Sequence, residues 1–368
     1  MNQKIAILFL GDYRFDGRCT NMINALIKNN SVHIFYVKKK AYDKKNKLKN
    51  LTEVNVQPSK KKIFKYLHWT ILIYQLLRHH DFHKIIASDL YSLFPLYLVK
   101  KNIIIIYDSR EIFTELAAHH HSKIKKHIIR FIENLCLQRV SIILTSADSD
   151  TTFIKKKYTN YIHIKYYTIF NFPHMITIKE KSNYLRSKYN ISKSDTILIY
   201  QGVLQKGRGI QQMIRIIENT INMVGVIIGD GEEKYNYKKY VKSISLNKRI
   251  YFIDSLPYLE LLKITCSADI GLALIRPMGI SYQYALPNKL FEYAICGIPC
   301  LASNLPNMKK YIDKYKLGLS VNNNLSKQIN AINQLALPDN QKKYFKNRLN
   351  PKLIWEFQED KFIRIICN

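Results

Sequence analysis

The stretch ALPNKLFEYAICGIPCLAS, residues 285–303, says most about the fold of this chain. A proline and an asparagine precede a short segment with apolar residues at helical spacing, and Gly297 is placed to end that helix. The apolar run 298–302 that follows is typical of a buried strand. A short helix followed at once by a buried strand predicts one repeat of an α/β sheet.

The same stretch carries the chemistry of a phosphate site. Unpaired N–H groups at a helix N-terminus attract anions, and Lys289 adds a full positive charge in the first turn. Glu292 comes one turn further on, where a carboxylate can accept hydrogen bonds from the two hydroxyls of a ribose. This spacing favours the binding of a nucleotide-activated substrate.

Length and composition indicate two domains without disulfides. The chain has 368 residues, 47% of them hydrophobic, which is enough for two separate cores. Residues 1–10 have no cleavage-site pattern, so we interpret them as a strand rather than as a signal peptide. The six cysteines are scattered and form no CxxC pair, so we expect reduced thiols in a cytoplasmic protein and no metal site.

The formal net charge is +31, and much of it lies in the lysine-rich segment 38–65. Such a field attracts phosphates of nucleic acid, of anionic lipid or of an anionic substrate. The overlapping segment 63–80, IFKYLHWTILIYQLLRHH, is amphipathic and aromatic. Together the two segments predict an anionic membrane surface as a partner, or alternatively an ordinary core-facing helix beside a solvated lysine-rich surface.

Strand and helix patterns alternate along both halves of the chain. The predicted strands are 4–10, 32–37, 84–87, 103–107 and 141–145, and then 196–200, 224–228, 250–253, 270–273 and 298–302. This alternation predicts an α/β protein with two Rossmann-like, doubly wound domains that face a cleft. We place the first domain at 1–173, the second at 174–345, and at 346–368 a C-terminal helix that packs back toward the first domain.

Four regions of the sequence resemble, in order, the retaining glycosyltransferases of the GT-B fold, glycosyltransferase family 4. They are YDSREIFTEL at 107–116, YQGVLQKGRGIQQMI at 200–214, VGVIIGDG at 224–231 with YFIDSLPYLELLKITCSADIGLALI at 251–275, and LPNKLFEYAICGIPCLAS at 286–303. The resemblance implies transfer of a sugar from a nucleotide-sugar donor to a glycan or lipid-linked acceptor, with retention of anomeric configuration. It also implies a role in cell-envelope polysaccharide or glycolipid synthesis.

The resemblance assigns donor-binding roles in the second domain. Glu292 matches the glutamate that holds the ribose, Arg208 matches a basic residue that contacts the diphosphate, and Gly202 allows close approach to it. The other expected donor-binding residues are Lys206, Gly229, Ile253, Asn288 and Lys289. The alternatives are a surface carboxylate at 292 and an exposed basic turn at 206–208. The resemblance implies no essential metal and no other cofactor.

On the acceptor side, Arg110 stands where many relatives have a histidine close to the reacting centre, and Glu111 follows it; both are candidate catalytic residues. Arg110 keeps its charge, so it can stabilise an anion but cannot act as a general base. The alternative is a strand-end turn that caps a helix. We expect the first loop to line the cleft, although its two arginines also suit a plain surface. Its candidate residues are Gly11, Asp12, Arg14 and Arg18.

Two departures from the family pattern keep other functions open. Val203 replaces an arginine that often follows the loop glycine, and Tyr284 replaces a glutamate that usually touches the donor sugar. The alternatives are a non-catalytic transferase subunit, a GT-B epimerase or phosphorylase, and a basic nucleic-acid-binding protein. The last has no recognised binding module, so no nucleic-acid partner is expected. The DxD triplet 148–150 we interpret as the charged first turn of a helix and not as a metal site.

Overall fold

The computed structural model describes residues 3–39, 48–59, 61–99, 102–113, 123–178, 180–348 and 350–368. The chain divides into two compact units, which we call unit 1 (Met1–Asn171 with Gln358–Asn368) and unit 2 (Phe172–Phe357). The sequence placed the first boundary close to this position, at residue 173, whereas it ended the second domain at 345. Unit 2 continues beyond that point because the backbone N–H of Trp355 donates to the carbonyl of Pro173 (2.8 Å).

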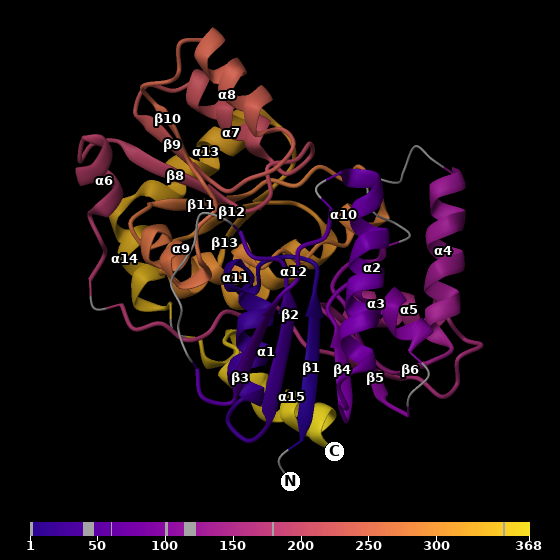
Figure 1. The fold of residues 1–368 in the computed structure, drawn as a ribbon. Helices are drawn as coiled ribbons and strands as arrows, with labels where there is room; N and C mark the ends of the chain where they lie inside the picture. The colour runs from indigo at the N-terminus through magenta and orange to yellow at the C-terminus, as the bar shows by residue number, and fades with distance from the viewer. Residues whose placement is uncertain are drawn as a thin grey trace. The chain divides into compact units, whose positions relative to one another are not determined.

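Unit 1 is built on a seven-stranded parallel sheet (Figure 1). Its strands are β1 (Lys4–Phe9), β2 (Ser31–Tyr36), β3 (Leu51–Asn55), β4 (Lys84–Ala87), β5 (Ile104–Ser109), β6 (Val140–Thr145) and β7 (Lys165–Thr168). The spatial order is β3-β2-β1-β4-β5-β6-β7. The chain reverses its direction of strand addition beside β1, and open α/β sheets bind ligands outside the strand ends at such a switch point.

Two of these strands, β3 and β7, are not among the predicted ones. They are the edge strands of the sheet and are largely exposed or half-buried. The strands between them carry long buried apolar runs, such as those of β1 and β5. The apolar signal therefore weakens at the edges, where one side of a strand faces solvent.

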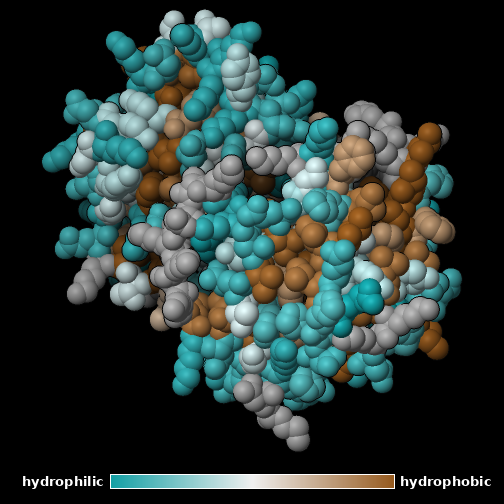
Figure 2. Space-filling view, in the orientation of Figure 1, coloured by the Kyte–Doolittle hydropathy of each residue, from teal (hydrophilic) through white to brown (hydrophobic). Residues whose placement is uncertain are grey.

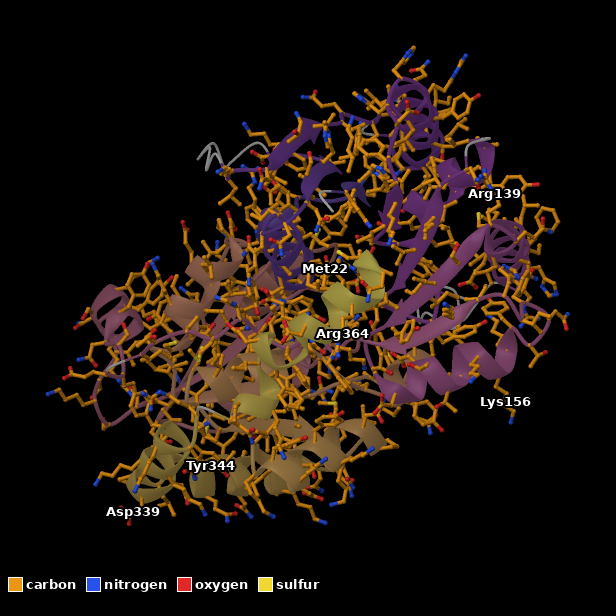
Figure 3. All side chains as sticks on the ribbon, turned by 90° about the horizontal axis from the view of Figure 1, so that it is seen from below. Met22, Arg139, Lys156, Asp339, Tyr344 and Arg364 are labelled. Carbon is orange, nitrogen blue, oxygen red and sulfur yellow. The ribbon has the colours of Figure 1, made fainter. Side chains whose placement is uncertain are left out.

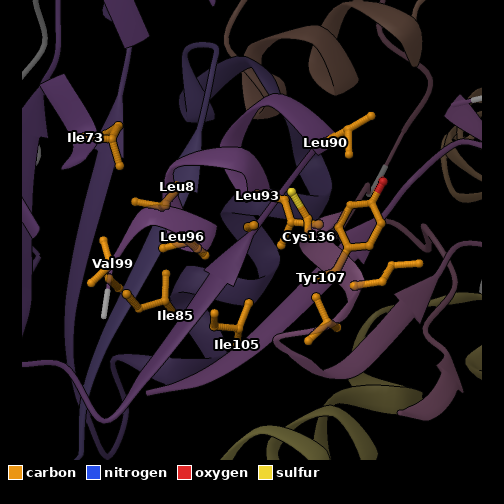
Figure 4. Close-up of a cluster of buried hydrophobic side chains, with 14 of the residues drawn as sticks. Leu8, Ile73, Ile85, Leu90, Leu93, Leu96, Val99, Ile105, Tyr107 and Cys136 are labelled. Atoms are coloured by element: carbon orange, nitrogen blue, oxygen red, sulfur yellow. The ribbon is translucent and has the colours of Figure 1, made fainter. Parts of the chain in front are cut away.

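The helices of unit 1 cover both faces of its sheet. They are α1 (Gly17–Leu26), α2 (Lys62–Arg78), α3 (Leu90–Leu98), α4 (Lys123–Leu137), α5 (Asp148–Lys157) and most of α15 (Glu356–Cys367). One core joins strand side chains such as Leu8 and Ile85 to Ile73 of α2 and Cys136 of α4 (Figure 4). No helix in the described parts of the chain has the length and hydropathy to cross a membrane.

The C-terminal helix α15 returns to unit 1. It lies beside α1, as Figure 3 shows with Arg364 on α15 and Met22 on α1. The Lys84 Nζ donates to the carbonyl of Ile366 (2.6 Å), and the Gln3 side-chain amide donates to the carbonyl of Cys367 (3.0 Å). These bonds attach the end of the chain to β1 and β4, at the centre of the sheet.

Unit 2 is built on a six-stranded parallel sheet. Its strands are β8 (Thr196–Gln201), β9 (Met223–Ile228), β10 (Ile250–Ile253), β11 (Ile270–Ala273), β12 (Cys300–Ser303) and β13 (Gly318–Val321), in the spatial order β10-β9-β8-β11-β12-β13. Its helices are α6 (Tyr184–Tyr189), α7 (Ile210–Glu218), α8 (Lys234–Ser243), α9 (Tyr258–Thr265), α10 (Ile280–Gln283), α11 (Lys289–Ile295), α12 (Pro306–Tyr315), α13 (Leu325–Ala336) and α14 (Pro338–Lys346). The prediction of two doubly wound α/β halves is confirmed.

The stretch 285–303 forms α11 and β12, as its pattern predicts. Gly297 has a φ of +71°, and a Cβ there would come within 2.8 Å of the Phe345 ring, so glycine is required to end the helix. The Tyr293 hydroxyl reaches the carbonyls of Ile199 (3.2 Å) and Leu272 (3.3 Å). These contacts hold α11 on the sheet and fix its first turn beside the carboxyl ends of β8 and β11.

Candidate functional site

The loops that follow β8, β9 and β10 meet at the carboxyl edge of the unit 2 sheet. The N–H of Gly202 donates to the carbonyl of Ile228 (3.0 Å), and the N–H of Gly229 donates to that of Ile253 (3.0 Å). Three of the predicted donor-binding positions, Gly202, Gly229 and Ile253, are therefore brought together by backbone bonds between neighbouring strand ends.

The approach of two of these loops depends on glycine at position 229. Its φ is +150°, in the region that favours glycine, and an added Cβ would lie 1.9 Å from the carbonyl oxygen of Gly202. That neighbour is backbone, which cannot move aside as a flexible side chain can. Glycine is therefore required at position 229 for the two loops to pack together at the sheet edge.

Lys289, the first residue of α11, is buried at this edge. It is 8% exposed, and its Nζ lies 3.6 Å from the centroid of the Tyr200 ring. The same Nζ would be 3.6 Å from a Cβ added to Gly202, so the ammonium lies against the loop after β8. We call this loop, with Gly202, and the loop after β9, with Gly229, the glycine loops. Burial lowers the pKa of Lys289 to about 7, with Arg208 lowering it further and Glu292 opposing the shift. Such a poorly solvated cation is stabilised when an anion binds beside it.

Glu292 lies one turn along α11 and is buried with its carboxylate held in place. The side-chain Nε2 of Gln201 donates to Oε2 of Glu292, and the side-chain Oε1 of Gln201 accepts from the Thr265 hydroxyl (2.6 Å). Thr265 thereby fixes which way the amide of Gln201 points. A carboxylate has about four lone-pair sites, so Glu292 retains acceptor capacity for a pair of hydroxyls.

The two predicted cations of the glycine loop differ in their surroundings. Arg208 Nε donates to the Tyr282 hydroxyl (3.1 Å), and its guanidinium lies 4.7 Å from the centroid of that ring. Lys206 projects outward with its side chain 76% exposed, and its Nζ is 3.6 Å from Oε1 of Glu233. Arg208 and Lys289 are thus held near the strand ends, whereas Lys206 is a surface residue that a ligand would have to recruit.

The remaining predicted donor position, Asn288, occupies the N-cap of α11 without capping it through its side chain. Its carbonyl oxygen instead accepts from the N–H of Phe291 (2.9 Å) and of Glu292 (3.0 Å). The two positions that depart from the family pattern, Val203 and Tyr284, are both exposed. Neither supplies a charge, so the positive charge that we expect near the diphosphate comes from Lys289 and Arg208.

Four residues of this site were missed by the sequence reasoning. They are Tyr200, Gln201, Thr265 and Tyr282, which position Lys289, Glu292 and Arg208. One signal was available: Gln201 is a polar residue that ends an apolar strand. Successive side chains of a strand point to opposite faces, so Gln201 lies on the face that α9 and α11 cover, and Tyr200 on the other.

The carboxyl edge of the unit 1 sheet carries an ion-pair network. Asp108, at the end of β5, accepts from Arg18 Nη2 (2.6 Å) and from Arg110 Nε (2.9 Å), and Arg110 Nη1 reaches Asp16 (2.7 Å). Burial acts to raise the pKa of Asp108, but the two guanidinium groups outweigh it and the pKa is lowered. The network fixes a positive charge, that of Arg110, at the strand ends.

Arg18 corrects one of the predictions from sequence. Its side chain is 1% exposed, and it also donates from Nη1 to Oδ1 of Asn171 (2.8 Å) and to the carbonyl of Ile169. It therefore joins α1, β5 and the segment after β7 inside unit 1. This buried position fits neither a cleft-lining residue nor the alternative of a plain surface arginine.

The other acceptor-side candidates lie on the loops beside this network. Asp12 is buried and pairs with Arg14 through two bonds, Nε to Oδ1 (2.8 Å) and Nη2 to Oδ2 (2.6 Å). Gly11 packs on its near neighbour Phe9, whose ring would lie 3.0 Å from an added Cβ. Glu111 is exposed on the loop after β5, where a ligand can reach it.

The DxD triplet lies in the first turn of α5, as predicted. Asp148 and Asp150 are its acidic first-turn residues, and three lysines occupy its last turn. Burial raises the pKa of Asp150 to about 6, and its carboxylate accepts from the hydroxyls of Ser146 (3.2 Å) and Ser149 (3.3 Å). Among the residues that the structure describes, no three His, Cys, Asp or Glu side chains are grouped to hold a metal ion.

Comparison with solved structures identifies the fold. Sucrose-phosphate synthase from Thermosynechococcus elongatus superposes with a TM-score of 0.77 at 14% identity, over 99% of this chain and 98% of that one. HepE of Anabaena, solved in complex with UDP-glucose, has a TM-score of 0.73 at 13% identity over the whole of both chains. The GT-B fold predicted from the sequence is thereby confirmed.

Comparison of sequences points to one family in unit 2. The O-antigen biosynthesis glycosyltransferase WclY of Escherichia coli is 29% identical over 144 residues, which are 39% of this chain and 38% of the relative. The chain thus matches well under half of that relative's length. Residues 182–349, which contain the glycine loops and α11, match the family described as glycosyl transferases group 1.

Proposed function

We propose that this protein is a glycosyltransferase that moves a sugar from a nucleotide-sugar donor to a glycan or lipid-linked acceptor. The observation that carries the proposal is the meeting of Lys289, Arg208 and Glu292 with two glycine loops at one sheet edge, within the region that matches the glycosyl transferases group 1. Two similar proteins, an O-antigen biosynthesis glycosyltransferase and HepE solved in complex with UDP-glucose, support a role in cell-envelope glycan synthesis.

The donor is proposed to bind unit 2 through complementary charge and hydrogen bonds. Glu292 accepts from the ribose hydroxyls, and Lys289 and Arg208 offset the diphosphate, with Gly202 leaving room for it and Gly229 letting the two loops meet. The same cations would stabilise the negative charge that grows on the leaving nucleotide during transfer. Because side chains supply this positive charge, we propose that no metal is required, and activity in the presence of EDTA tests this.

The acceptor is proposed to bind unit 1 near Arg110 and Glu111. The Arg110 charge is fixed by Asp108 and Asp16, so it can hold an anionic group of the acceptor or of the leaving group without reorganising. Retention of configuration is part of the proposal, and it rests on the resemblance to glycosyltransferase family 4. Analysis of the product anomer tests it directly.

We also propose that the protein works in the cytoplasm at an anionic membrane surface. All six cysteines are free, and five are buried, as suits a reducing compartment. The net charge of +31 favours association with anionic lipid. Part of the lysine-rich segment, residues 40–47 and 60, lies outside the described residues.

The experiment that tests the proposed function combines binding and turnover. A thermal-shift panel of UDP, GDP, ADP and CMP should reveal one nucleotide that raises the unfolding temperature, since a ligand of the folded state stabilises it. The matching labelled nucleotide-sugar, supplied with membranes, should then yield free nucleotide and a labelled glycan.

Nucleotide that stays attached to a changed sugar would indicate an epimerase. Binding without turnover would indicate a non-catalytic subunit. Salt-sensitive RNA binding without nucleotide binding would overturn the proposal.

A further inference from the structure

Helix α2 presents large apolar side chains to solvent as well as to the core. Trp69, Ile73 and Leu77 are fully buried in the unit 1 core. Phe64, Leu67 and Ile71 lie on the opposite side of the helix and are exposed. The sequence suggested either a membrane-binding helix or an ordinary core-facing helix. The structure shows a core-facing side and, opposite it, an exposed apolar row, so each interpretation describes one side of α2.

Helix α4 repeats this feature. Ile124, Ile128 and Phe131 follow one another at helical spacing and are all exposed, Phe131 by 69%. Its inner side packs on the same core as α2 through Cys136 and Leu137. Figure 2 shows hydrophobic side chains on the outer sides of both helices. We call these six residues the apolar surface of unit 1: Phe64, Leu67, Ile71, Ile124, Ile128 and Phe131.

The charge around the apolar surface has one sign. The sequence of α2 contains no aspartate or glutamate, and the one in α4, Glu133, is buried at 3% exposure. Lys61 and Arg130 are exposed beside the two apolar rows, and α4 begins with the sequence KIKKHIIR. On these two helices the described side chains include no exposed carboxylate. An apolar face of this kind bordered by cations complements an anionic, amphiphilic layer and opposes a basic partner such as a second copy of this +31 chain.

The apolar surface lies toward the carboxyl edge of the unit 1 sheet. Helices that connect parallel strands run back against them, so the first half of such a helix lies near the strand ends (Figure 1). Phe64, Leu67, Ile124 and Ile128 lie in the first halves of α2, which follows β3, and of α4, which follows β5, and Ile71 and Phe131 come one residue after the midpoints. Both helices also pack against α3, which places their outer sides along the same flank. This is the edge that carries Asp12 and Arg110.

We propose that unit 1 docks on an anionic lipid leaflet through the apolar surface on α2 and α4. The apolar side chains enter the interfacial region of the leaflet while the surrounding cations meet lipid phosphates, which is the two-signal arrangement that peripheral binding needs. The surface adjoins the edge at which the acceptor is proposed to bind, so a lipid-linked acceptor would reach that edge from the leaflet. The docking names the surface for the membrane association proposed above, and this last step rests also on the proposed transferase function.

Vesicle co-sedimentation of the full chain tests the docking. The wild-type protein should bind phosphatidylcholine vesicles that contain phosphatidylglycerol about tenfold or more tightly than vesicles of phosphatidylcholine alone. The paired variants Leu67→Gln/Ile71→Gln and Ile128→Gln/Phe131→Gln should each weaken that binding roughly tenfold or more. The matched control is Ile162→Gln/Ile221→Gln, which removes two isoleucines that are 94% and 93% exposed elsewhere, and it should bind as the wild type does.

The outcomes separate docking from the proposed transferase function. All variants replace exposed side chains, and unchanged thermal unfolding and unchanged stabilisation by nucleotide will show that fold and donor site are intact. Equal vesicle binding by wild type and both paired variants would overturn the docking proposal. So would a wild-type dimer that the paired variants dissociate while vesicle binding stays the same. Absence of nucleotide binding by the wild type would instead contradict the proposed transferase function alone.

Discussion

We expect stability and ligand binding to oppose each other at Lys289. Its pKa of about 7 is below the usual 10.5 because the ammonium is buried, with Arg208 nearby. Below pH 7 the folded protein bears the full cost of a buried charge. At about 1.36 kcal/mol for each pH unit of the difference between 10.5 and 7, this cost is roughly 5 kcal/mol when Lys289 is fully protonated and roughly 4 kcal/mol at pH 7, where half of it is. The cation–π contact of the ammonium with the Tyr200 ring offsets about 1–2 kcal/mol of this cost.

Replacing Lys289 by Met removes the charge and keeps a side chain of similar length. We therefore expect Lys289→Met to raise the free energy of unfolding of the ligand-free protein by about 2 kcal/mol at pH 7. The unfolded chain holds the lysine proton up to pH 10.5, whereas the folded protein loses it above pH 7, so wild-type stability gains from Lys289 as pH rises. The advantage of the variant should thus be largest at pH 7 and below and shrink toward pH 10.

The same substitution should weaken nucleotide binding. A charge-assisted hydrogen bond to a diphosphate contributes about 1.5–3 kcal/mol, so the dissociation constant for UDP should rise roughly 10- to 150-fold. Bound diphosphate should also raise the pKa of Lys289 again. Calorimetric titrations at pH 8 in two buffers of different ionisation enthalpy should then detect proton uptake by the wild type and none by the variant.

Urea unfolding at several pH values and calorimetry with UDP test both effects. Lys206→Met is the matched comparison, because Lys206 also belongs to the glycine loop but is exposed; its unfolding free energy should change by less than about 0.5 kcal/mol. The reasoning fails if Lys289→Met lowers stability at pH 7 as an ordinary core substitution does. It also fails if the variant binds UDP, with proton uptake, as the wild type does.

Three further substitutions probe other parts of the two sheet edges. Gly229→Ala should cost about 3 kcal/mol of unfolding free energy by urea titration, because its Cβ would overlap the Gly202 carbonyl at a positive φ; an unchanged midpoint would contradict the close approach of the loops. Glu292→Gln should keep the unfolding temperature and abolish the preference for UDP over 2′-deoxy-UDP in calorimetry, since a ribose hydroxyl loses its carboxylate acceptor; a preserved preference would refute that role. Arg110→Met should lower the free energy of unfolding by about 3 kcal/mol, because it leaves Asp108 short of one partner. It should also lower turnover while the affinity of unit 2 for UDP stays constant, and normal turnover would exclude a catalytic role.

The central strands could be predicted from sequence because a strand that is buried on both faces has a continuous run of apolar residues. The run of isoleucines in β5 is an example, and its predicted range overlaps the observed Ile104–Ser109. The edge strand β3, LTEVN, carries exposed polar residues and leaves no such signal. The apolar surface on α4 also escaped prediction, because periodicity shows that a helix has an apolar face but not whether another element covers it.

The candidate site was predictable where its chemistry is local and not where it depends on distant partners. Lys289 and Glu292 lie within one helix, so their spacing could be read directly. Gln201 acquires its role only when Thr265 and Glu292 meet it, through contacts between separate strands and helices. Arg18 was misplaced for the same reason, since its burial is decided by Asp108, far along the chain on β5.

The return of α15 to unit 1 determines when that unit can be completed. During synthesis the chain emerges from its N-terminus, so all of unit 2 is made before residues 358–368 exist. Until then the sheet of unit 1 lacks the helix that carries the buried Phe362 and Ile366, together with the bond from Lys84. The half of the protein that is translated first therefore matures last, and a chain cut before residue 358 would have all but the last residues of a folded unit 2 while unit 1 still exposes part of its core.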